Sequence, residues 1–349
     1  MESQKKIIFC SYQIGCANNL LPIARKFQEN GHSVMVFAAG KSFLKWREDK
    51  NLELLLLEDS IPPSELKGLI EREGPDLIFT GTDPQSFFDY NFRRIGNANN
   101  IKVASILDYW SFYKDRFFRS KNEDKKSLPD YIFAIDEMAK LGLVECGIDS
   151  MKINVMGSPS YQALHKKYFL AQKKNTHSAR ILFLSQPIHR LHGKKLGFTE
   201  GDSLNSFIRV LNSSGVDYRL DVKPHPRENL KEIKRYVQGE SLEKTFFLDP
   251  HSDLYSGIYK YGLVAGIVSS ALIEAAILGI PTLSIQNGKA RDFHFFGTVA
   301  CITPTVFSEN ELTEKLLSGF DKSIKYPDLS YLYKNATENI VDFLFNILG

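Results

Sequence analysis

Short apolar runs, each long enough for a β-strand, alternate with segments of helical periodicity along most of the chain. In the first half, helices such as Asn18–Asn30 and Pro63–Glu73 separate the predicted strands. These strands are Lys6–Cys10, Ser33–Ala39, Leu52–Leu57, Asp76–Thr80, Lys102–Leu107, Tyr131–Ala134 and Ile153–Met156. A strand–helix–strand series requires right-handed crossovers, which produce a parallel sheet with helices on both faces. The pattern therefore predicts an α/β protein with a doubly wound parallel sheet.

A polar connection between about residues 161 and 180 interrupts this pattern once, and the pattern then restarts. In the C-terminal tail, Leu332, Ile340 and Leu344 stand at helical spacing, so this segment can pack back on the first domain. We expect two Rossmann-like doubly wound domains, residues 1–160 and 161–330, that face a cleft, and a C-terminal helix within 331–349. The second set of predicted strands is Arg180–Ser185, Tyr218–Val222, Thr245–Leu248, Leu263–Val268, Pro281–Ile285 and Thr298–Ile302.

The composition is that of an ordinary globular protein. With 349 residues, 43% hydrophobic and 24% charged, the chain can build two cores and is not disordered. Its net charge of +3 is too small to indicate nucleic-acid binding, but it is compatible with anionic ligands or with peripheral association at a membrane surface. No apolar run approaches the roughly 20 residues that span a bilayer. Cys10, Cys16, Cys146 and Cys301 lack disulfide or metal-site spacing, which favours a cytoplasmic location.

Two segments of the second domain combine the end of a strand with groups that bind anions. The strand Tyr218–Val222 delivers Lys223 and His225 to its carboxyl end, between two prolines that restrict the backbone. A later strand ends at Ser269 and Ser270, which can cap the helix that follows. A helix start has unpaired N–H groups and a positive dipole, so hydroxyls placed there form a phosphate cradle. The two segments together predict a nucleotide-phosphate site at the carboxyl edge of the second sheet.

Each of these side chains also has a structural alternative. His225 can donate a hydrogen bond to a phosphate oxygen and stabilise the leaving nucleotide, or it can be satisfied within a turn. Lys223 can neutralise phosphate or lie in solvent, and Ser269 and Ser270 can do no more than cap the helix. Either segment alone is unspecific. Their occurrence together, in this order and both at strand ends, favours the phosphate site.

Three further residues are candidates for nucleotide binding. Glu274 lies one helical turn beyond the serines, where it can accept hydrogen bonds from ribose hydroxyls or simply favour the helix dipole. Gln186 ends its strand and can contact the base. Gly15 lies in the predicted loop after the first strand, but the segment Tyr12–Cys16 has one useful glycine and is no dinucleotide fingerprint.

The architecture and these motifs resemble those of the GT-B glycosyltransferases. Phe27–Val34, in which a helix ends at Gly-His before a strand, resembles the N-terminal part of that fold. The segment Lys223–Pro226 and the pair Ser269-Ser270 resemble the motifs that hold cytidine monophosphate in bacterial GT-B sialyltransferases. They are also similar to the motifs of CDP-glycerol glycerophosphotransferases and capsule polymerases. The chain also resembles a family of surface-polysaccharide biosynthesis proteins, and the residues that carry this resemblance are Ile106–Trp110, Tyr113, Arg116, Phe117 and Leu128–Asp130.

The acidic motif that supplies the general base in the sialyltransferases is missing from the first domain. Asp83 and Asp108, each just past a predicted strand, are the candidate catalytic replacements. A carboxylate at such a position can take the proton from an acceptor hydroxyl as it attacks the sugar. Either aspartate can equally be a helix cap.

The resemblance implies a metal-independent glycosyltransferase. It would move a nonulosonic or Kdo-type sugar from a nucleotide-activated donor, with CMP the expected nucleotide, to a hydroxyl of a surface glycan or lipid-linked glycan. The nucleotide-sugar donor is then a co-substrate, and no separate cofactor, metal or nucleic acid is expected. A CDP-glycerol-type phosphotransferase would share both motifs, and a UDP-GlcNAc 2-epimerase-like enzyme would share the fold but need several acids and histidines. A non-catalytic GT-B-like nucleotide-binding protein would lack the base. The oligomeric state is left open.

Overall fold

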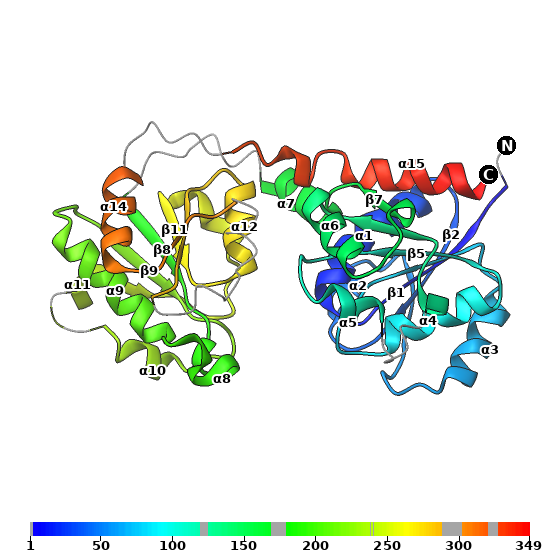
Figure 1. Ribbon diagram of the computed structural model, residues 1–349, viewed down its shortest axis with the longest axis horizontal. Helices are drawn as coiled ribbons and strands as arrows, with labels where there is room; N and C mark the ends of the chain where they lie inside the picture. The colour runs from blue at the N-terminus through cyan, green and yellow to red at the C-terminus, as the bar shows by residue number, and fades with distance from the viewer. Residues whose placement is uncertain are drawn as a thin grey trace. The chain divides into compact units, whose positions relative to one another are not determined.

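A computed structural model describes residues 3–118, 125–168, 179–237, 239, 241–287, 302–319 and 327–349 (Figure 1). Contacts divide the chain into two compact units. Unit 1 comprises Met1–Ala163 and Ser330–Gly349, and unit 2 comprises Leu164–Leu329. The sequence predicts a domain boundary at residue 161, and the contacts place it at residue 163, within helix α7 (Pro159–Tyr168).

Unit 1 contains a seven-stranded parallel sheet in the order β3-β2-β1-β4-β5-β6-β7. The strands are β1 (Lys6–Ser11), β2 (Ser33–Ala38), β3 (Glu53–Leu56), β4 (Leu77–Thr80), β5 (Lys102–Ile106), β6 (Tyr131–Ala134) and β7 (Ile153–Val155). All seven coincide with predicted strands. The strand order reverses between β1 and β4, so the connections that follow these strands go to opposite faces and leave a crevice at the carboxyl edge.

Helices cover both faces of this sheet because successive side chains on each strand point to opposite faces. Ile7 and Phe9 pack with α1 (Ile14–Glu29) and α15 (Ala336–Leu348), whereas Ile8 and Cys10 pack with α3 (Pro63–Glu73) and α4 (Phe88–Ala98). On α15, Phe345 contacts the ring of Phe27, so the C-terminal helix lies on unit 1 (Figure 1). The remaining helical segments of unit 1 are α2 (Ser42–Trp46), α5 (Tyr113–Phe117), α6 (Glu137–Glu145), η1 (Lys125–Ser127), η2 (Ser150–Lys152) and η6 (Ser330–Leu332).

Unit 2 contains a six-stranded parallel sheet in the order β10-β9-β8-β11-β12-β13. Its strands are β8 (Arg180–Leu184), β9 (Arg219–Lys223), β10 (Thr245–Phe247), β11 (Leu263–Gly266), β12 (Thr282–Ile285) and β13 (Thr305–Val306). The order reverses between β8 and β11. Of the strand predicted at Thr298–Ile302, residues 298–301 lie outside the described residues; β12 pairs with β11 on one side and with β13 on the other.

On one face of this sheet, Phe183 of β8 packs with Phe207 and Leu211 of α9 (Glu200–Ser213) and with Leu312 of α14 (Glu309–Gly319). The other face is buried as well, for example at Leu182 and Val264. The predicted helix Asp253–Lys260 is a 3₁₀ segment, η5 (Tyr255–Lys260), with a kink at Gly257. The other helical segments of unit 2 are α8 (Ile188–His192), η4 (Gly193–Leu196), α10 (Leu230–Lys234), α11 (Ser241–Lys244) and α12 (Ser270–Ile277). The two sheets confirm the predicted fold class.

Candidate functional site

The predicted phosphate-binding residues of unit 2 follow three neighbouring strands. Gln186 comes after β8, His225 after β9 and Ser269 after β11, and β8 lies between the other two. Gln186 Oε1 accepts a hydrogen bond of 2.8 Å from the N–H of Val268, so its side chain links the ends of β8 and β11. The strand order reverses between these two strands, and parallel α/β sheets bind ligands at such a reversal. The structure therefore brings both motifs to one edge of the sheet.

Ser269 is the N-cap of α12. Its hydroxyl accepts a hydrogen bond of 3.3 Å from the N–H of Ala271, while Ser270 is the exposed first residue of the helix. The capping alternative therefore holds for Ser269. A cap leaves the helix dipole directed at the same place, so it is compatible with an anion there. Phosphate binding by the two hydroxyls stays a prediction.

His225 lies in a turn that fixes the orientation of its ring. The N–H of Arg227 donates to His225 Nδ1 at 3.1 Å, and the N–H of Glu228 donates to the His225 carbonyl oxygen at 2.8 Å. Because Nδ1 accepts a hydrogen bond, a neutral imidazole carries its proton on Nε2. His225 Nε2 is thus the donor in this tautomer, which is the form needed to bind a phosphate oxygen.

Lys223 holds the loop that follows β10. Its ammonium donates to the carbonyl oxygens of Asp249, Pro250 and Ser252 at 2.9, 3.2 and 2.8 Å. Desolvation lowers the pKa of Lys223. The alternative of a lysine that merely lies in solvent therefore does not hold, because the structure gives Lys223 hydrogen bonds within the loop. A direct contact with phosphate stays a prediction.

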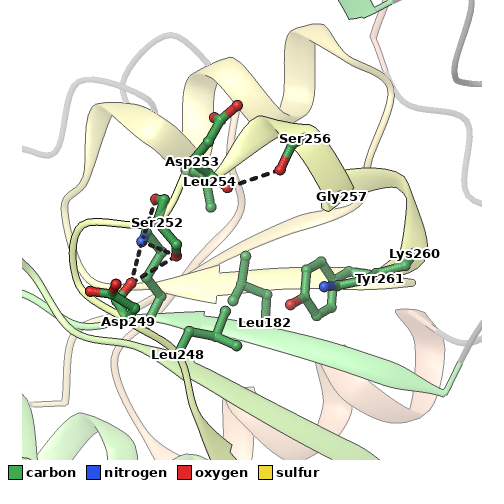
Figure 2. Close-up of a pocket in the computed structure, with 11 residues that line it drawn as sticks. Leu182, Leu248, Asp249, Ser252, Asp253, Leu254, Ser256, Gly257, Lys260 and Tyr261 are labelled. Carbon is green, nitrogen blue, oxygen red and sulfur yellow. Dashed lines mark hydrogen bonds between the residues drawn. The ribbon is translucent and has the colours of Figure 1, made fainter.

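A pocket of about 280 Å³ lies between this loop, η5 and the sheet (Figure 2). Leu182 and Leu248 line its lower side in the view, and Asp253, Leu254 and Ser256 lie above them. Ligand pockets that enclose a drug-sized molecule have volumes of about 300–1,000 Å³. The pocket is therefore slightly smaller than a site that encloses a whole ligand of that size.

Glu274 already has a partner within unit 2. Its Oε2 accepts a hydrogen bond from the hydroxyl of Tyr255, the first residue of η5. Burial raises the pKa of Glu274 to about 7. A ribose hydroxyl would have to share this carboxyl with Tyr255 or displace the tyrosine, a contact that the sequence did not indicate.

In unit 1, Asp108 lies at the carboxyl end of β5 in an ion pair with Arg116. The distance from Arg116 Nη1 to Asp108 Oδ1 is 2.7 Å, and the two side chains are 5% and 15% exposed. Arg116 also donates to the carbonyl oxygen of Thr82, after β4, at 2.7 Å. The guanidinium thus links two strand ends and holds a carboxylate that solvent still reaches.

Gly15 is not in a loop, as predicted, but in the first turn of α1, because that helix begins at Ile14 and not at Asn18. A Cβ added to Gly15 would lie 2.4 Å from Asp108 Oδ2. The glycine is therefore required by the close approach of Asp108 to the start of α1. Its predicted role in nucleotide binding stays a prediction, and the neighbour that the structure shows is Asp108, one of the two candidate catalytic residues.

Asp83 is buried, and its carboxyl is hydrogen-bonded within a turn. Its Oδ1 accepts hydrogen bonds from the N–H groups of Gln85, at 2.8 Å, and Ser86. Its own N–H donates to Asp89 Oδ2 at 2.9 Å. Asp83 is therefore held in a turn and is not a helix cap, because the N-cap of α4 is Phe87, whereas Asp108 is the better placed acid. The sequence analysis did not single out Asp89, although an acidic residue inside a run of aromatic residues is a recognisable signal.

Two further properties apply to the part of the chain that the structure describes. There, no three His, Cys, Asp or Glu side chains gather in a way that would hold a metal ion. No helix in the described ranges combines the length and apolar character needed to cross a membrane.

The two parallel sheets, their strand orders and their flanking helices define a two-domain Rossmann-like GT-B fold. The UDP-GlcNAc 2-epimerase from Methanocaldococcus jannaschii shares it with a TM-score of 0.72 and 17% identity, over 98% of this chain and 99% of that one. The UDP-GlcNAc 2-epimerase from Neisseria meningitidis, bound to UDP-GlcNAc, gives 0.71 and 16%, over 98% and 100%. The apo form of the lipopolysaccharide outer core galactosyltransferase WaaB gives 0.60 and 12%, over 98% and 99%.

No protein-family model matches the chain, and no curated protein matches it. At these identities the structural likeness shows the fold alone. It confirms the GT-B part of the predicted resemblance, and the sialyltransferase part stays a prediction.

Proposed function

We propose that this protein is a nucleotide-sugar enzyme that binds a uridine diphosphate sugar at the carboxyl edge of the unit 2 sheet. The observation that carries the proposal is the convergence of Gln186, His225 and the Ser269 cap on the strand ends around the β8–β11 reversal. Further support comes from solved structures of similar fold that hold UDP-GlcNAc, or UDP-GlcNAc and UDP. These favour UDP over the CMP that the motifs suggest.

Epimerisation of the sugar is the reaction we favour. An epimerase changes the configuration of one sugar carbon and needs acid–base groups near that carbon, but no acceptor. Of the two candidate acids of unit 1, Asp108 is the one that an ion pair holds in place and that solvent still reaches. The 2-epimerases that share the fold over nearly the whole chain support this choice over group transfer.

A glycosyltransferase is the second candidate. The His-Pro and Ser-Ser pair, which resembles a cytidine-nucleotide site, and the similarity to the WaaB galactosyltransferase favour it. In that case a nonulosonic or Kdo-type sugar would pass from CMP to a glycan or lipid-linked glycan, and Asp108 would take the proton of the acceptor hydroxyl.

Nucleotide binding separates these candidates first. In thermal-shift and calorimetric titrations with UDP, CMP, CDP and GDP, UDP should give the largest stabilisation, because binding to the folded state alone raises its stability. His225→Ala should weaken UDP binding by about 1.5–3 kcal/mol, the range for hydrogen bonds to charged groups. His251→Ala, which removes an exposed histidine of the same unit, is the matched control and should bind as wild type does.

The reaction itself is followed by proton NMR of UDP-GlcNAc incubated with the enzyme. A new sugar epimer formed without any acceptor supports epimerisation. A clear preference for CMP would move the assignment to the transferase, and unchanged UDP affinity in His225→Ala would overturn the phosphate role of that residue.

A further inference from the structure

Glu228 joins the end of β8 to the turn that carries His225. Its Oε1 accepts a hydrogen bond of 2.7 Å from the hydroxyl of Ser185, and its Oε2 accepts one of 2.6 Å from the N–H of His225. Ser185 is 5% exposed, and its own N–H donates to the carbonyl oxygen of Lys223 at 3.0 Å. The carboxyl of Glu228 therefore spans two neighbouring strand ends at the point where the chain turns towards His225.

The same turn sets the tautomer of the histidine. His225 and Glu228 are joined twice, through Glu228 Oε2 and through the bond from the Glu228 N–H to the His225 carbonyl oxygen. Between them lies Arg227, whose N–H donates to His225 Nδ1. Without the carboxyl, the N–H of His225 loses its acceptor, and the backbone that directs the Arg227 N–H at the ring is no longer restrained.

The placement of this acid is not explained by stability. Glu228 is half-buried, and desolvation raises its pKa to about 7. Removing a carboxylate from water costs free energy that hydrogen bonds only partly return. A group held at such a position is better explained by the geometry that it imposes on its neighbours.

We propose that Glu228 is a positioning residue that fixes the turn and the ring of His225, so that Nε2 is held ready to donate to a phosphate oxygen. This inference rests on the proposed function, in which His225 contacts the phosphate of a nucleotide. It adds to the site a residue that itself need not touch the ligand.

The first test is the affinity for UDP. Glu228→Ala should weaken binding on the order of tenfold, because a loosened turn misplaces the donor. Glu228→Gln should retain most of the affinity, since its amide oxygen can accept from the His225 N–H and its NH₂ group can donate to the Ser185 hydroxyl. Glu232→Ala, an exposed glutamate on α10, is the matched control and should bind as wild type does.

A double-mutant cycle distinguishes positioning from an independent contact. In a His225→Ala background, Glu228→Ala should change UDP affinity less than about twofold, because the side chain that Glu228 positions is gone. Full additivity of the two effects would overturn the proposal.

The second test needs no ligand. Long-range proton–nitrogen NMR of the free protein reports the tautomer of His225, whose signals are assigned by their loss in His225→Ala. Wild type and Glu228→Gln should show the Nε2–H tautomer, and Glu228→Ala should show a mixture of tautomers. An unchanged His225 spectrum in Glu228→Ala would overturn the positioning role.

The two tests fail separately. If wild type does not bind UDP, the proposed function is wrong, while the tautomer experiment still decides the role of Glu228. If Glu228→Ala does not fold, Ser185→Ala, which removes one of the two bonds to the carboxyl, takes its place in both measurements. Wild-type affinity together with a wild-type His225 spectrum in Ser185→Ala would then count against the proposal.

Discussion

Replacing Asp89 with asparagine should destabilise unit 1 in acid and stabilise it at alkaline pH. Asp89 is 0% exposed and lies in the first turn of α4. Its Oδ2 accepts the N–H of Asp83, while Oδ1 has no hydrogen-bond partner among the described residues. Burial raises the pKa of Asp89 from 3.8 to about 7. The folded protein therefore keeps a proton on this carboxyl at pH values where the unfolded chain has lost it.

The direction and size of the effect follow from this difference in pKa. Below about pH 4 the carboxyl is protonated in both states, and its contribution to stability is fully present. As the pH rises towards 7, the unfolded chain releases the proton first, so the free energy of unfolding falls by about 1.4 kcal/mol per pH unit. Over the interval from 3.8 to about 7 the loss is at most roughly 4 kcal/mol, and it is constant above pH 7.

Asparagine has no such pH dependence. It keeps an oxygen for the N–H of Asp83, but it buries an NH₂ group, at a cost of about 1–3 kcal/mol. Asp89→Asn should therefore be less stable than wild type at pH 4 and more stable at pH 8. The two stabilities should be equal between about pH 4.5 and 6, where the loss in wild type reaches that cost.

Urea unfolding followed by tryptophan fluorescence measures this difference. Both tryptophans, Trp46 and Trp110, are buried in unit 1, so their emission follows the unit that contains Asp89. Asp115→Asn, at an exposed position of the same unit, is the matched control and should stay within about 0.5 kcal/mol of wild type. A difference between Asp89→Asn and wild type that varies by less than about 1 kcal/mol from pH 4 to 8 would refute the reasoning.

Three other substitutions test the candidate site residues, and a fourth, Gly68→Ala, is the control for the first of them. Gly15→Ala should lower the free energy of unfolding by about 1–3 kcal/mol, because its Cβ would lie 2.4 Å from Asp108 Oδ2. Gly68→Ala, at an open helix position, should raise it by up to about 1 kcal/mol, and urea unfolding compares the two. Lys223→Met should speed amide hydrogen exchange at Asp249, His251 and Ser252 by roughly tenfold or more, since three carbonyl oxygens lose their donor. Asp108→Asn should lower turnover by about 10²-fold or more with nearly unchanged UDP affinity, and wild-type turnover would dismiss this residue as the catalytic acid or base.

The sheets could be predicted because buried parallel strands are continuous apolar runs. Leu77–Thr80, for example, is buried at every position and is bounded by Asp76 and Gly81. The exceptions are short elements. β13 has two residues, Thr305 and Val306, and α2 has five, Ser42–Trp46, so neither is long enough to show a period. Such elements are determined by the strands and helices that they pack against.

The position of the candidate site could be predicted from the sequence, whereas most hydrogen-bond partners of its side chains could not. Parallel strands end at one edge of a sheet, which is why the order of His225 and Ser269 along the chain was enough to place them together. The partners of Lys223 and Glu274 could not be predicted in this way. These partners are backbone carbonyls and the Tyr255 hydroxyl, which tertiary structure brings from the segment between β10 and β11.

Both units secure their strand ends with a long polar side chain, within a fold that is shared with solved structures at 12–17% identity. A core position needs only an apolar side chain of suitable volume, so the sheets tolerate wide substitution. The carboxyl edge is different, because loops that diverge there leave backbone groups that must find partners. Arg116 satisfies this need in unit 1 and Gln186 in unit 2. Arg116 also holds Asp108, and Gln186 accepts the N–H of Val268, the residue before the Ser269 cap. The groups that satisfy the backbone at this edge therefore also orient the candidate catalytic and binding residues.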